Sequence, residues 1–246
     1  AEGGGEEGEG GGGGEGGGVA REGGEEGARP GARPGARSGE ISISMAGFYL
    51  ACSTMQQASE ALGGFISLAN KNDEGNLRKL KKAWTALERS EANGRGGGSR
   101  CATVRGLLEL ERDSGIHGRG GLLADPSAAM AILWLRRSMD FMVGVQANVM
   151  ALDEGGSKRG DSMKRAAFEA YAEHLEPFHN WLLKNTFQVA LKLVPSKREF
   201  LQRLGPLVAE EVTEAELRDH AEVVKQITDT LRMLFRELDL EDTRKV

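Results

Sequence analysis

Hydrophobic residues beyond position 40 recur every three or four residues, which is the spacing of amphipathic helices, and few stretches alternate with a period of two. Proline and glycine breaks divide this pattern into eight segments. The predicted helices cover 46–62, 74–92, 101–112, 126–150, 161–175, 177–194, 195–204 and 213–238. Because the connections are short, the pattern predicts an all-α fold in which neighbouring helices run largely antiparallel.

Capping signals mark two of these helix starts. Asp125 precedes Pro126, which predicts an N-cap residue followed by proline at the first helical position. Thr213 is followed by Glu216, which is the spacing of a capping box.

The first forty residues lack this pattern. They hold 18 of the 36 glycines, nine Glu and four Arg, and Val19 is their only large aliphatic residue. Such a segment cannot bury enough apolar area to offset the entropy lost on ordering. We therefore expect a disordered tail over 1–44 and one folded domain over 45–246.

Charge and composition exclude several classes. The net charge of −5 resides entirely in the first forty residues, so the neutral remainder has no electrostatic footprint for nucleic acid. No apolar run approaches the roughly 20 residues of a membrane span, and the N-terminal segment resembles neither a transit nor a secretory peptide. Cys52 and Cys101 form no metal or redox pattern, so we expect free thiols and a cytoplasmic protein.

The search for catalytic chemistry finds little. The four histidines are His117, His174, His179 and His220. They belong to no metal, nucleophile or phosphate-binding motif. The sequence therefore predicts no enzyme, no metal and no other cofactor.

Two segments carry side chains suited to a sugar. Asn72, Asn76 and Lys79 have the spacing of one helix face, and two amides with an ammonium can hydrogen-bond to hydroxyls. The alternative, which spacing alone favours, is ordinary capping of a helix N-terminus by Asn72 or Asp73. Trp134 lies in an apolar run, so core packing is the simpler interpretation, and a platform for a sugar ring is the functional one.

These segments, with a third, resemble motifs of the glycolipid transfer protein family. Residues 72–79 read Asn-Asp-Glu-Gly-Asn-Leu-Arg-Lys, similar to the family's Asp-x-x-x-Asn-x-x-Lys with Gly before the Asn. Residues 134–137 read Trp-Leu-Arg-Arg, similar to Trp-Leu-Lys-Arg, and residues 178–181 read Phe-His-Asn-Trp, similar to Tyr-His-x-Trp. The resemblance covers about 47–246 and implies a two-layer helical sandwich around an apolar lipid pocket.

The resemblance also implies roles for single residues. Asn76 and Lys79 would bind the first sugar, Trp134 would stack under it, and His179 would bind the ceramide amide carbonyl. The family's Asp is replaced by Asn72, which loses a charge-assisted hydrogen bond, unless Asp73 serves instead. The ceramide-1-phosphate type has Arg where this chain has Met130 and Trp134, so the resemblance favours the sugar type.

The implied function is non-enzymatic binding of glycosphingolipids and their transfer between membranes. The protein would dock on the membrane surface peripherally and reversibly, with Trp181 at the interface and Lys184 helping; half-buried packing of Trp181 is the alternative. A lipid sensor or interaction protein, ceramide-1-phosphate transfer and an unrecognised hydrolase using His179 are competing functions. The oligomeric state does not follow from the sequence.

Overall fold

A computed structural model describes residues 42–60, 64–93, 100–151, 159–204 and 210–246. The predicted tail lies outside these described residues, except for 42–44. The described ranges form eight α-helices and no strand, which confirms the all-α prediction. Their one strand-like pairing is an isolated bridge between Ser44 and Thr103.

The helices follow the order that the hydrophobic pattern predicts. They are α1 (Met45–Glu60), α2 (Ser67–Asn93), α3 (Val104–Asp113), α4 (Ala128–Met150), α5 (Arg159–His174), α6 (Trp181–Leu191), α7 (Lys197–Leu204) and α8 (Glu210–Glu237). Short 3-10 helices cover Gly64–Ile66, Arg100–Ala102 and Glu176–Phe178. None of the helices in the described ranges combines the length and the apolar run that crossing a bilayer requires.

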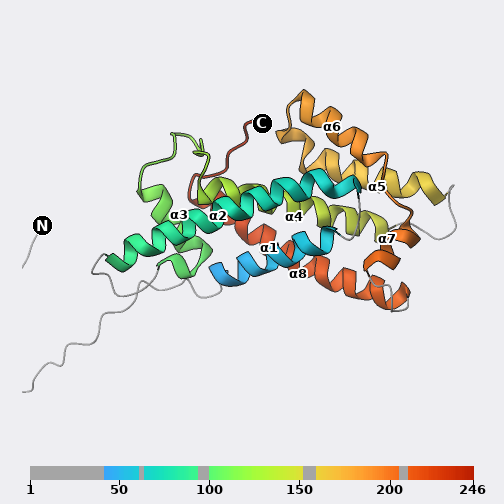
Figure 1. Ribbon diagram of the computed structural model, residues 1–246, viewed down its shortest axis with the longest axis horizontal. Coiled ribbons are helices and arrows are strands. Elements are labelled where there is room, and N and C mark those ends of the chain that lie inside the picture. Colours follow the sequence, from blue (N-terminus) through green and yellow to red (C-terminus); the bar gives the residue numbers. More distant parts are fainter. Residues whose placement is uncertain (1–41, 61–63, 94–99, 152–158, 205–209) are drawn as a thin grey trace, which may run out of the picture. The chain divides into compact units, whose positions relative to one another are not determined.

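Helix α4 is the centre of the core. It packs against α2, α5 and α8, and α1 packs against α2; in Figure 1, α2 crosses in front of α4. Seventeen of its 23 residues are buried, as expected for a helix that is apolar on nearly all sides. Two of the buried residues are Arg136 and Arg137, and Arg136 is paired with Glu241 at 2.6 Å. The helix that carries the candidate Trp134 is therefore held rigidly on three sides.

The start of α2 differs from the prediction. The helix begins at Ser67, so Asn72 and Asp73 lie in its interior and the capping interpretation is wrong. Asn and Asp favour caps because their side chains compete for backbone groups, but packing overrides this preference. Here Asp73 is buried and accepts a hydrogen bond from Ser138 of α4 at 2.7 Å.

Three other boundaries also differ. Helix α4 is capped by Ser127, whose side chain accepts from Met130 N at 3.0 Å, so the predicted Asp125 cap is wrong. Asp125 instead pairs with Lys79. The predicted helix 177–194 is split into a 3-10 turn and α6, which Asn180 caps. Helix α8 begins at Glu210, before the predicted capping box.

Candidate functional site

A cavity of about 370 Å³, here called the polar cavity, lies between α2, α4 and α6. Part of its wall is apolar and includes Trp134, Leu183 and Phe187. Its polar wall consists of Lys71, Asn72, Asn76, Lys79, Asp125, Ser138 and His179. Pockets with an apolar wall and a few converging polar groups are the usual form of a small-molecule site.

Helix α2 supplies three of these polar side chains from one face. Asn72, Asn76 and Lys79 all line the polar cavity, as their spacing predicts. Asn76 is 3% exposed, and its buried Nδ2 has no hydrogen-bond partner among the described residues. A buried unsatisfied donor costs about 1–3 kcal/mol, so this amide is suited to a ligand acceptor. Gly75 is not required by packing, because a Cβ there would meet open space.

Asp73 does not line the polar cavity. Its carboxylate points toward α4, where Ser138 Oγ donates to Oδ2 while the buried Oδ1 has no partner among the described residues. Burial raises the pKa of Asp73 to about 7, against the opposing effect of the Ser138 hydrogen bond. Burial, together with the charge of Asp73, also raises the pKa of the neighbouring Cys52 thiol. Asp73 therefore sits in the core behind Asn72 and Asn76.

This raised pKa predicts a pH-dependent stability. Between pH 4 and pH 7 the folded protein holds a proton on Asp73 that the unfolded chain releases, so stability falls as pH rises and levels off above pH 7. The fall is about 1.4 kcal/mol per pH unit. Asp73→Asn should remove this fall, so its stability relative to the unaltered chain should rise by about 2.7 kcal/mol between pH 5 and pH 8 in urea unfolding. Asp113→Asn, an exposed control, should show no such gain, and a pH-independent effect of Asp73→Asn would contradict the prediction.

The opposite wall is a cluster of rings. Trp134, 8% exposed, is stacked on His179 with ring centroids 5.9 Å apart and planes at 22°. Phe187 packs on the same imidazole at 5.0 Å, and the Tyr171 hydroxyl lies 3.1 Å from His179 Nδ1. Burial, with the charges of Arg137 and Lys184, lowers the pKa of His179 to about 4, so the ring is neutral at pH 7. If Tyr171 donates to Nδ1, the ring proton resides on Nε2 and can be donated to a carbonyl oxygen.

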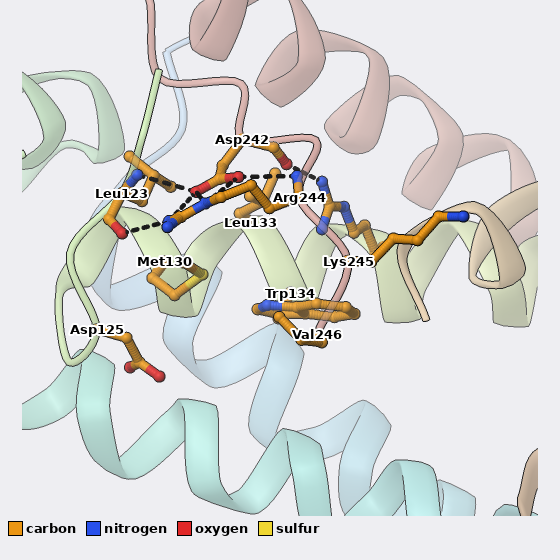
Figure 2. Close-up of a pocket in the computed structure, with 10 residues that line it drawn as sticks. Leu123, Asp125, Met130, Leu133, Trp134, Asp242, Arg244, Lys245 and Val246 are labelled. Carbon is orange, nitrogen blue, oxygen red and sulfur yellow. Dashed lines mark hydrogen bonds and ion pairs between the residues drawn. The ribbon is translucent and has the colours of Figure 1, made fainter. Parts of the chain in front are cut away.

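The C-terminal segment supports Trp134 from the other side. Figure 2 shows Trp134 and Val246 on the wall of a second cavity of about 290 Å³, which adjoins the first through Asp125, Trp134 and Val246. Asp242 accepts from Leu123 N at 2.9 Å and from Arg244, and its own carbonyl accepts from Arg137.

Arg137 and Val246 complete this support. The guanidinium of Arg137 lies 3.5 Å from the Phe178 ring centroid and 4.9 Å from that of Trp134. Val246 N donates to Phe178 O at 3.0 Å, and Val246 O accepts from Asn180 N at 2.7 Å. These contacts fix the indole and the His179 turn relative to each other.

Helix α6 presents an exposed apolar face. Trp181 is 73% exposed, so the half-buried alternative is wrong, and Leu182, Val189 and Leu193 are exposed beside it. Val189 and Leu193 lie on the outer side of α6 and of the following turn, so they do not line an interior pocket. Lys184 is paired with Glu176 at 3.1 Å.

A family model decides the classification. The model described as "Glycolipid transfer protein (GLTP)" matches residues 43–206. This chain belongs to the GLTP family. Glycolipid transfer protein 1 of Arabidopsis thaliana is 27% identical over 154 residues, covering 63% of this chain and 66% of that relative. Glycolipid transfer protein A of Xenopus laevis is 25% identical over 202 residues, covering 81% and 90%.

Solved structures confirm the GLTP fold. Mouse ceramide-1-phosphate transfer protein matches with a TM-score of 0.69 and 16% identity, over 82% of this chain and 91% of that one. The fungal glycolipid transfer protein HET-C2 matches with a TM-score of 0.65 and 20% identity, over 82% and 89%. One of these neighbours is named for ceramide-1-phosphate and the other for glycolipids, so the GLTP fold alone does not show whether a protein binds a phosphate or a sugar headgroup.

Some residues of the candidate site were absent from the sequence prediction. Tyr171 and Asp125 reach the cavity region from a helix and a loop that carry none of the motifs. Ser138 follows the Trp-Leu-Arg-Arg motif by one residue and could have been found as the next position of the same helix. No sequence signal identifies Tyr171, because its role depends on how α5 packs beside the His179 turn.

Proposed function

We propose that this protein binds glycosphingolipids and carries them between membranes without a chemical step. The observation that carries this proposal is the pairing of a fixed indole, Trp134, with the unpartnered amide of Asn76 in one cavity. A sugar ring has apolar C–H faces that pack on an aromatic ring and hydroxyls that need donors and acceptors at its edge. The proposed mechanism needs no metal or other cofactor.

Each polar group has a distinct role in this proposal. Asn76 and Lys79 bind hydroxyls of the first sugar, and neutral His179 donates to the ceramide amide carbonyl. Asn72 stands where the family motif has Asp, and its amide makes a neutral hydrogen bond in place of a charge-assisted one about twice as strong. Asp73 does not substitute for it, because its carboxylate lies on the core side of α2.

The acyl chains require a different environment. On the apolar side of the cavity, Leu68, Leu175 and Phe187 lie beside the proposed headgroup position. A volume of about 370 Å³ suits a sugar and is too small for two long chains as well. We propose that chain entry displaces core side chains. Buried methionines of α4 and α5 can adapt to such a change, because their unbranched side chains repack easily: Met130, Met139, Met142 and Met163.

The exposed face of α6 is the proposed membrane-docking surface. Trp181 and Leu182 are exposed, and residues 181–193 contain no acidic side chain. Tryptophan favours the depth of lipid headgroups. Lys184 has a smaller part than Trp181, since Glu176 already neutralises it. Docking is peripheral and reversible, at the cytoplasmic surface of membranes.

A vesicle-transfer assay tests this function. Donor vesicles carry glucosylceramide, galactosylceramide, ceramide-1-phosphate or phosphatidylcholine, and the rate of appearance in acceptor vesicles is measured. We expect both glycosylceramides to move at least tenfold faster than the other two lipids. Binding of glycosylceramide without transfer would favour a lipid sensor. Preferential transfer of ceramide-1-phosphate would mean that the protein carries a phosphate headgroup and not a sugar. If the protein hydrolysed one of these lipids and His179→Ala abolished that hydrolysis, the protein would be an enzyme.

A further inference from the structure

Asp125 places a carboxylate on the wall of the proposed headgroup site. It lies in the segment between α3 and α4, and Figure 2 shows its side chain directed toward α2. Its two oxygens lie 2.7 and 3.0 Å from Lys79 Nζ. It lines both the polar cavity and the adjoining cavity.

The ion pair cancels the charge of Lys79 on the wall of the polar cavity. Lys79 is compensated by Asp125, and the two Asn side chains carry no charge. His179 is uncharged at pH 7, because its pKa is lowered to about 4. Arg137 lines the adjoining cavity and lies over the rings of Trp134 and Phe178. Lys71, on the wall of the polar cavity, is exposed, and Lys245 and the Asp242-paired Arg244 line the adjoining cavity.

An anionic headgroup in this cavity would meet an unfavourable arrangement. Phosphate is bound best by guanidinium pairs or by several donors with net positive charge. Here the nearest ammonium already has a carboxylate partner, and a phosphate that approached Lys79 would also approach Asp125. Like charges within about 4–6 Å repel strongly in partly buried sites. A sugar hydroxyl, by contrast, can donate to that same carboxylate.

We propose that Asp125 is a selectivity residue that excludes phosphate- and sulfate-bearing headgroups and favours uncharged sugars. It acts by neutralising Lys79 and by repelling the anion directly. This inference rests on the proposed function, because it requires the headgroup to bind in the polar cavity. It also explains how a fold shared with ceramide-1-phosphate carriers could be restricted to one class of headgroup.

The test is Asp125→Asn in the full chain. Asparagine keeps the size and one acceptor oxygen, removes the charge and frees Lys79. Transfer between vesicles is measured for glucosylceramide, sulfated galactosylceramide and ceramide-1-phosphate. We expect the transfer rates of the two anionic lipids to rise, so that their ratio to the glucosylceramide rate increases at least tenfold. The control is Asp229→Asn, which breaks ion pairs with Lys225 and Arg232 on α8, away from both cavities, and should leave the ratio unchanged.

The same substitution made in a Lys79→Met protein separates the electrostatic effect of Asp125 on the headgroup from an effect on the fold. In Lys79→Met only the direct repulsion by Asp125 remains, so adding Asp125→Asn should still raise the ratio, although no ammonium is freed to bind the anion. An unchanged ratio in Asp125→Asn, both with and without Lys79, would overturn the inference while the unaltered chain still carried glucosylceramide. If the unaltered chain moved no glucosylceramide, the proposed function itself would fail.

Discussion

Replacing Trp134 with leucine should lower glucosylceramide transfer at least tenfold, while phenylalanine at the same position should retain it within about threefold. Both residues fill an apolar site, but only phenylalanine presents an aromatic face to the sugar. A tenfold loss corresponds to about 1.4 kcal/mol. The measurement is the initial rate of transfer between vesicles, with the free energy of unfolding determined for both variants.

The alanine variant is less informative by itself. Truncating a buried Trp costs about 3–5 kcal/mol of stability, and here it would also release the contacts that Arg137 and His179 make with the indole. Trp84→Leu is the matched control, because Trp84 lies half-buried on α2 against Tyr49, 6.3 Å away, and does not line the polar cavity. Equal transfer by the leucine and phenylalanine variants of Trp134 would show that the indole only packs.

The helices were largely predictable because each is set by local periodicity. All eight appear in the predicted order, and the interior of each follows the spacing of its apolar residues. The errors lie at boundaries where tertiary contacts override local preference. Asn72 and Asp73 look like caps, yet they lie in the second turn of α2, where Asp73 accepts a hydrogen bond from Ser138.

The candidate site was predictable only in part. Asn72, Asn76 and Lys79 share a helix, so their spacing brings them to one cavity. The other groups depend on packing between distant segments, which no local pattern encodes. The pairing of Lys79 with Asp125 joins α2 to a loop 46 residues away, and the Tyr171 hydroxyl meets His179 through the packing of α5.

Asn76→Leu should separate binding from stability. Leucine has the same number and branching of side-chain heavy atoms, removes the buried Nδ2 that lacks a partner and favours the helix more than asparagine does. Removing such a donor gains about 1–3 kcal/mol, so we expect Tm to rise by several degrees. Glycosylceramide binding should weaken at least tenfold, because the amide that meets the sugar is gone.

The control for this change is another amide that already has a partner. Asn148 Nδ2 donates to the Ala166 carbonyl at 3.0 Å, between α4 and α5. Asn148→Leu removes that hydrogen bond between two helices, so it should lower Tm and leave glycosylceramide binding unchanged. Thermal unfolding and binding to glucosylceramide vesicles are measured for both variants. A residue kept only for the fold would lose stability when replaced. A rise in stability with a loss of binding at Asn76 would therefore mean that its unpaired amide serves the ligand, whereas a fall in Tm with unchanged binding would remove Asn76 from the site.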